Sequence, residues 1–136
     1  MPLPEFHLRV SVEGAVSPSE DLAKVRMAVA NVLGECRHEV EELPQMVRMT
    51  SEDSASITRL HDQLRDRHVR AAARRLLMAG REGNVATVML NRQAAYAGVL
   101  ALCGSQEESP LGPIHLTIRS EELDEVIEWL TAYETG

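Results

Sequence analysis

The fold of this chain is decided by one stretch of its sequence, FHLRVSVEGAVSPSEDLAKVRMAVANVLG at positions 6–34. Over 6–13 apolar and polar residues alternate, the period that places apolar side chains on one face of a β-strand. Ser-Pro-Ser-Glu at 17–20 is typical of a capping box, with Ser17 as the N-cap of a helix and Glu20 reaching back. Gly34 supplies the left-handed residue that stops such a helix. The stretch therefore predicts a strand followed by a helix whose buried stripe is Leu22, Val25, Val29, Val32 and Leu33.

The rest of the chain continues this alternation of strands and helices. Five segments are predicted strands: 6–12, 38–50, 84–90, 98–103 and 114–119. Four stretches are predicted helical: 17–33, 54–79, 91–96 and 120–130. The stretch 54–79 is one helix or two, because Val69 and Leu76 lie off the apolar stripe of its first half, which indicates a break near 66–68.

Local residues assign positions to several of these elements. Pro44 has no N–H to donate to a ladder, so the strand around it belongs at a sheet edge. The strands at 84–90 and 98–103 are apolar on both faces, the pattern of central strands covered on both sides. Asn91 is the predicted cap of the short helix, and Ser120 is the predicted cap of the last one.

Length and composition place the chain among single-domain proteins. With 136 residues, of which 44% are hydrophobic, it can bury a core without disulfides. Cys36 and Cys103 lack Cys-x-x-Cys spacing, which argues against a disulfide framework. We predict one two-layer α+β domain over 1–136, ordered over about 6–133, with about five helices against a mostly antiparallel sheet of about five strands.

The charge balance bears on partners and location. Fourteen basic and 21 acidic residues give a net charge of −7, which repels polyanions at long range and makes RNA a disfavoured partner. The N-terminus has no signal-peptide pattern, and no apolar run approaches the ~18 residues that span a bilayer. We therefore expect a cytoplasmic protein that does not enter a membrane.

Several short motifs, in this order and at this spacing, resemble those of a known family. They are Ser17 to Asp21, Leu60-His61 with Arg65, Leu-Asn-Arg-Gln-Ala-Ala at 90–95, Ser-Pro-Leu-Gly-Pro-Ile at 109–114, and Trp129-Leu130. From about Leu8 to Leu130 the chain resembles the archaeal family catalogued as uncharacterised protein family 0201, also called domain of unknown function 54. The resemblance implies an RRM-like antiparallel sheet with five helices, similar to the RNA-binding domain of the ribosomal protein that holds 5S rRNA. It brings no catalytic residues, and its motif loop comprises Asn91, Gln93, Ser109, Pro110, Gly112 and Pro113.

The strongest candidate for a binding surface is a group of arginines in the predicted helical run. If that run is one continuous helix, the group falls within an arc of about 80°. Its members are Arg59, Arg67, Arg70, Arg74 and Arg81. Such a stripe could hold nucleic-acid phosphates, or another anion, through guanidinium forks. The alternative is a solvated outer face whose arginines pair with nearby acids.

Other kinds of site lack their usual sequence patterns. The candidate central strands contain no Phe, Tyr or Trp on which bases could stack. Cys36 with His38, and His61 with His68, each offer two metal ligands, but no pattern brings three or four together, so no metal or cofactor is predicted. No P-loop, dinucleotide fingerprint or nucleophile elbow occurs, and no residue stands out as catalytic.

Three functions remain open at this point. We predict a non-enzymatic binding or interaction domain whose partner the sequence does not identify. The second reading is an RNA-binding protein that uses the arginine-rich helix and shape rather than base stacking. The third is an enzyme or metal protein whose site no motif marks.

The predicted sheet also bears on self-association. Because its central strands are apolar on both faces, a two-layer fold leaves one apolar face uncovered unless a helix folds across it. We therefore predict a homodimer that covers this face, with two-fold symmetry. Cover by the helix at 91–96, or by half of the long helix, is the alternative.

Overall fold

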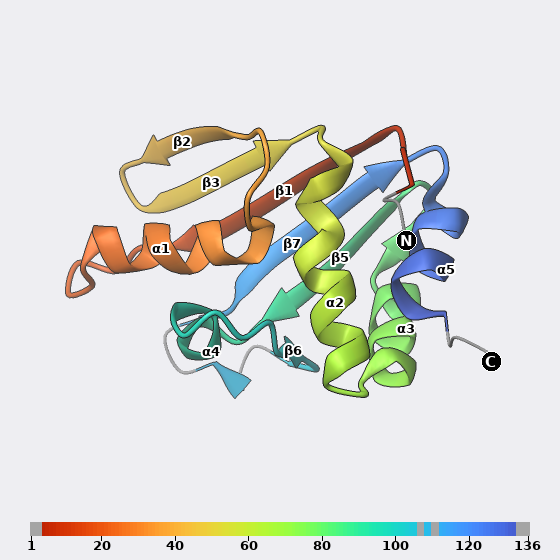
Figure 1. The fold of residues 1–136 in the computed structure, drawn as a ribbon. Coiled ribbons are helices and arrows are strands. Elements are labelled where there is room, and N and C mark those ends of the chain that lie inside the picture. Colours follow the sequence, from red (N-terminus) through yellow and green to blue (C-terminus); the bar gives the residue numbers. More distant parts are fainter. Residues whose placement is uncertain (1–3, 106–107, 110–111, 133–136) are drawn as a thin grey trace.

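One antiparallel sheet with helices packed against it organises the chain (Figure 1). The computed structural model describes residues 4–105, 108–109 and 112–132. In chain order its elements are β1 (Leu8–Ala15), α1 (Leu22–Leu33), β2 (Glu39–Leu43), β3 (Met46–Ser51), the 3-10 turn η1 (Ser54–Ile57), α2 (Thr58–Asp66), α3 (Arg70–Ala79), β4 (Arg81–Glu82), β5 (Val85–Leu90), α4 (Arg92–Tyr96), β6 (Leu102–Cys103), β7 (Ile114–Ser120) and α5 (Leu123–Thr131). The predicted α+β class is confirmed.

The first and last strands of the chain form the centre of the sheet. The strand order is β2-β3-β1-β7-β5-β4, and β6 pairs with the end of β5. All of these pairs are antiparallel, and β1 lies beside β7 with Val10 opposite Ile118. The N-terminal and C-terminal parts of the chain are thereby joined through backbone hydrogen bonds.

The helices bury one face of this sheet. The helix α1 packs on β1 and β3, α3 packs on β5, and α5 packs on β7. The helix α1 approaches β1 closely at Gly14, where a Cβ would lie 3.4 Å from the side chains of Val25 and Val29. The predicted inward residues of the last helix are all buried: Leu123, Val126, Ile127 and Leu130. Since each such side chain contributes roughly 1.5–3 kcal/mol on burial, this face supplies the core.

Two strand predictions are wrong in their details. The segment 38–50 is a hairpin of β2 and β3 rather than one strand, because Pro44 lies in the turn, where its missing N–H costs no ladder bond. The segment 98–103 is not central and contributes only β6. Gly98 has φ +80°, and the Ala101 carbonyl accepts from the backbone N–H of Asn91 at 2.8 Å, which leads the chain away from the sheet. The central places belong to β1 and β7.

The first helix begins later than the capping box predicts. Its N-cap is Asp21, whose Oδ1 accepts from the backbone N–H of Ala23 at 2.9 Å. Glu20 does fold back onto the N–H of Ser17, at 3.0 Å, but the two close a turn ahead of the helix. Leu22, predicted to be buried, is 43% exposed as a result.

Some of the other predicted helix boundaries are confirmed, and others are shifted in the structure. Gly34 ends α1 with φ +68°, and the Asn91 side chain caps α4, both as predicted. Ser120 is the last residue of β7, and its Oγ accepts from Glu122 N–H just before α5 begins. The helical run 54–79 is broken: His68 adopts φ +56° between α2 and α3, so the second of the two readings is the correct one.

The face of the sheet opposite the helices is mainly polar. We call it the open face; it carries Arg9, Ser11 and Glu13 of β1, Arg48 and Thr50 of β3, Val85, Thr87 and Met89 of β5, and His115, Thr117 and Arg119 of β7. No helix of the described residues packs on it. The continuous apolar face behind the homodimer prediction is absent here, because 98–103 does not enter the sheet centre. In the described part of the chain no helix is long and apolar enough to cross a membrane.

A substitution at Gly80, where the end of α3 meets β5, tests how closely the helices pack on the sheet. A Cβ on Gly80 would lie 2.0 Å from the Thr87 carbonyl oxygen, so we expect Gly80→Ala to lower the free energy of unfolding by about 1–3 kcal/mol. Denaturant unfolding measures this. The control is Gly104→Ala, where the nearest atom, a Glu108 carboxylate oxygen, lies at 3.5 Å. Equal stability of both variants would contradict the close approach.

Candidate nucleic-acid interface

The five predicted arginines do not form one stripe. The chain turns at His68, so they are divided between α2, the turn after it, α3 and β4. Each instead donates to the protein itself: Arg59 to Asn31 O at 2.9 Å, Arg67 to Leu100 O at 3.0 Å, Arg70 to Ala132 O at 2.9 Å, Arg74 to Glu128 at 2.8 Å, and Arg81 to Asp124. Two of the carbonyls belong to the C-terminal ends of α1 and α5, where a cation is favourable. These side chains tie the helical layer together.

The histidine and cysteine pairs do not converge either. His61 stacks on Trp129, with ring centroids 4.1 Å apart, and Phe6 meets the same indole edge-on. His68 lies exposed in the turn after α2. Among the described residues no group of three or more His, Cys, Asp or Glu side chains could hold a metal ion.

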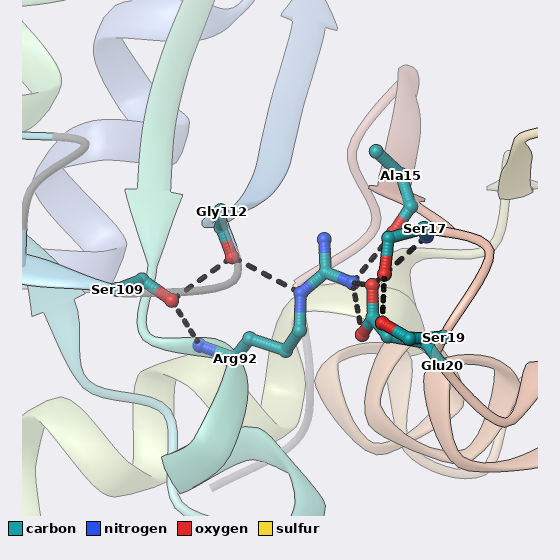
Figure 2. Close-up of polar contacts among 7 residues, drawn as sticks. All are labelled: Ala15, Ser17, Ser19, Glu20, Arg92, Ser109 and Gly112. Atoms are coloured by element: carbon teal, nitrogen blue, oxygen red, sulfur yellow. Dashed lines mark hydrogen bonds and ion pairs between the residues drawn. The ribbon is translucent and has the colours of Figure 1, made fainter.

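A buried ion pair brings the motif segments together (Figure 2). The Arg92 side chain is fully buried, and its Nη1 lies 2.9 Å from Oε2 of Glu20, whose side chain is 7% exposed. The same nitrogen donates to the Ala15 carbonyl at 2.5 Å, and Nε donates to the Gly112 carbonyl at 3.0 Å. Ser109 Oγ accepts from the Arg92 backbone N–H and donates to Gly112 O. One side chain thus links the end of β1, the loop before α1, α4 and the loop before β7.

The charges of this pair stabilise one another. Burial by itself would raise the pKa of Glu20, but the Ser17 N–H and the Arg92 guanidinium outweigh it, so the pKa lies below its usual value of 4.5. Burial, with the charge of Glu20 adding to it, raises the pKa of the nearby Tyr96 phenol. Because Arg92 has no exposed surface, its guanidinium cannot touch a macromolecular ligand, and we describe the network around it as a structural clamp.

Two residues of the motif loop, Ser109 and Gly112, take part in this clamp. Asn91 caps α4 and donates to Glu108 O at 3.0 Å, and Gly112 has φ +92°, which favours glycine. Pro113 is buried, while Gln93 is exposed on α4. Pro110 lies outside the described residues. Arg92 was not singled out in the sequence analysis. Its position between Asn91 and Gln93, within the family motif, could have indicated that it is important.

The open face presents a different kind of arginine. Arg9 of β1 lies directly opposite Arg119 of β7, both are exposed, and neither forms an ion pair within the described ranges. In the next row Ser11 lies opposite Thr50 on one side and Thr117 on the other. Thr117 in turn lies opposite Thr87, with the two hydroxyl oxygens 3.4 Å apart. Two guanidiniums therefore stand beside a row of four hydroxyls that crosses four strands.

The following row of the open face is neutralised internally. Arg48 pairs with Glu13 at 3.1 Å and with Glu41 at 3.5 Å. Like charges opposite one another destabilise a strand pair, so the Arg9–Arg119 juxtaposition has a cost that an anion between them would remove. The sequence places Arg9 and Arg119 in two predicted strands, at 6–12 and 114–119, but does not show that the two strands are neighbours.

Comparisons with known proteins give a consistent result. A family model described as RNA binding matches residues 9–120. A UPF0201 protein of Metallosphaera sedula is 38% identical over 123 residues, which cover 90% of this chain and 86% of that protein. A UPF0201 protein of Aeropyrum pernix is 39% identical over 126 residues, covering 90% of this chain and 84% of that one.

Solved structures extend the similarity to the fold. The crystal structure of the UPF0201 protein from Methanococcus jannaschii aligns with a TM-score of 0.75 at 26% identity, over 90% of this chain and 98% of that chain. Another UPF0201 crystal structure aligns with a TM-score of 0.77 at 21% identity, over 94% of this chain and 97% of that chain.

The clamp predicts a large difference between two glutamates that both pair with arginine. Glu20→Ala leaves the guanidinium of Arg92 buried without its counter-ion, so we expect it to lower the free energy of unfolding at pH 7 by about 3–5 kcal/mol. Glu128→Ala removes an exposed pair with Arg74 and should cost about 0–1 kcal/mol. Similar losses in urea unfolding would show that the buried pair is not special.

The same pair predicts an acid limit to stability. Because the pKa of Glu20 is lowered on folding, its stabilising contribution is present above pH 4.5 and is lost as the pH falls through the folded-state pKa. The difference in unfolding free energy between the parent and Glu20→Gln should therefore shrink as the pH is lowered below 4.5. Urea unfolding at a series of pH values checks this, and a difference that does not change with pH would refute it.

Proposed function

We propose that this chain, which belongs to the UPF0201 family, binds RNA through the open face of its sheet. Support comes first from the family model, whose description is RNA binding and which spans β1 to the end of β7. It comes second from the one observation that carries the choice of surface: two exposed arginines in register, unpaired in the described part of the chain, beside a row of hydroxyls.

The chemistry of the open face suits a sugar-phosphate backbone. Arginine and hydroxyl side chains are common donors to phosphate oxygens and sugars, and such contacts position a nucleic acid without reading its sequence. The row of Ser11, Thr50, Thr87 and Thr117 offers both donors and acceptors to ribose hydroxyls. The open face carries no Phe, Tyr or Trp, so stacking of several bases across it, as in RRM domains, is not part of the proposal.

The helical layer is the less suitable surface. Its five predicted arginines already donate to carbonyl or carboxylate oxygens, and binding a phosphate would mean breaking those contacts. In the sequence analysis, RNA binding ranked second because of the net charge of −7 and because the candidate central strands lack aromatic residues. That charge repels RNA at long range, so we expect weak binding. Because the contacts are between arginine and phosphate, we also expect the affinity to fall as the salt concentration rises.

Two substitutions and a matched control test the surface. Arg9→Ala and Arg119→Ala should each remove one phosphate contact, weaken RNA binding, and reduce the slope of log K against log salt by roughly 0.7–0.9. Arg75→Ala makes the same charge change on the exposed side of α3 and should leave the slope unchanged. Fluorescence anisotropy with a labelled RNA over a salt series measures both quantities. Equal effects of all three variants would mean that only net charge matters.

A further inference from the structure

The open face ends in a hollow where β1 and β2 begin and β3 ends. Its volume is about 630 Å³, within the range of small-ligand pockets. Arg9 and Thr50 line it from the open face, Glu39 from the start of β2, and Arg37, His38 and Glu52 from the adjoining loops. A second hollow of about 730 Å³ adjoins it and shares Arg37 and Glu52. A chain lying across the open face therefore has a recess beside Arg9.

Arg37 is positioned by its backbone and not by its side chain. Its N–H donates to Asp53 Oδ2 at 3.2 Å, and its carbonyl accepts from Ser51 Oγ at 2.5 Å. Hydrogen bonds from Ala55 N–H and then Arg37 N–H lower the pKa of Asp53, so this anchor is charged at neutral pH. The Arg37 guanidinium forms no hydrogen bond or ion pair with any described residue, apart from its attraction to Asp53. The backbone of Arg37 is therefore fixed while its side chain is available to a ligand.

The hollow is lined by both positive and negative side chains, and this limits the chemical class of ligand that it can hold. Arg9 and Arg37 attract an anion, but Glu39 and Glu52 line the same space and oppose a bare phosphate. A nucleotide meets both requirements, since its phosphate accepts from arginine and its base can donate to a carboxylate. Guanidinium planes also stack on unpaired bases.

From these contacts we infer that the hollow receives one unpaired nucleotide of the bound RNA, with a base that carries an amino group. Arg9 holds its phosphate, Arg37 stacks on the base, and Glu52 accepts from the exocyclic amino group. Adenine, cytosine and guanine carry such a group, whereas uracil carries none, and its one ring N–H on that edge lies between two carbonyl oxygens that the carboxylates repel. The inference rests on the proposed function and adds a preference for single-stranded, amino-bearing bases.

The test compares binding of four labelled 12-nucleotide RNAs by anisotropy: oligo(A), oligo(C), oligo(U) and a mixed-sequence duplex. We expect oligo(A) and oligo(C) to bind roughly 10-fold more tightly than oligo(U), a difference of about 1.4 kcal/mol. Glu52→Gln should bring this ratio close to one, because the amide also donates to uracil carbonyls. Glu121→Gln, an equal charge change at an exposed residue outside both hollows, should leave the ratio unchanged.

A second variant separates this inference from the proposed function. Arg37→Ala should weaken binding of oligo(A) and oligo(C) several-fold and leave duplex binding unaltered, whereas Arg119→Ala should weaken all four RNAs. If Arg119→Ala weakens binding but the four parent affinities show no base preference, the hollow is not a nucleotide site and the open-face function stands. If none of the RNAs binds at physiological salt, both proposals fail.

Discussion

A guanidinium without exposed surface holds one end of this molecule together. Arg92 meets the end of β1, the loop before α1 and the loop before β7, three segments that no strand pairing joins to α4 (Figure 2). Taking such a group out of water is costly unless a counter-ion and several acceptors compensate, and Glu20 with two backbone carbonyls supplies them. The tight loops of the family motif, including the left-handed Gly112, are arranged to bring those acceptors to it.

The remaining arginines divide between the two faces of the sheet. On the helical side they neutralise helix C-termini or pair with carboxylates, as Arg59 and Arg74 do. On the open face Arg9 and Arg119 stand opposite one another without such partners in the described part of the chain. A protein with net charge −7 therefore keeps a local positive site where its helices leave the sheet uncovered. At distances shorter than a Debye length, an anion interacts mainly with the nearest charged side chains and less with the net charge of the protein.

The open face and the hollow beside it have complementary properties. The strands of the sheet are paired along their length and packed on the core, so the register sets the spacing of the residues on the open face. The hollow is built from loops whose backbone is anchored by Ser51 and Asp53, and it exposes longer side chains. In the function proposed above, the open face would bind the sugar-phosphate backbone and the recess would take one base, which would combine general affinity with limited selectivity.

The sequence by itself determined the layers of this protein. Period-two alternation located β1 and β7, and the capping of α4 by Asn91 and the stop at Gly34 were confirmed because such signals act within a few residues. The sequence could not separate an apolar loop from a central strand at 98–103, since a short apolar run is compatible with both. Nor could helical periodicity foresee that His68 would adopt a left-handed conformation and divide the arginine stripe. Only the tertiary structure decided the candidate site, because Arg9 and Arg119 become neighbours through a strand pairing that spans almost the whole chain, and Arg37 reaches the same surface through a loop.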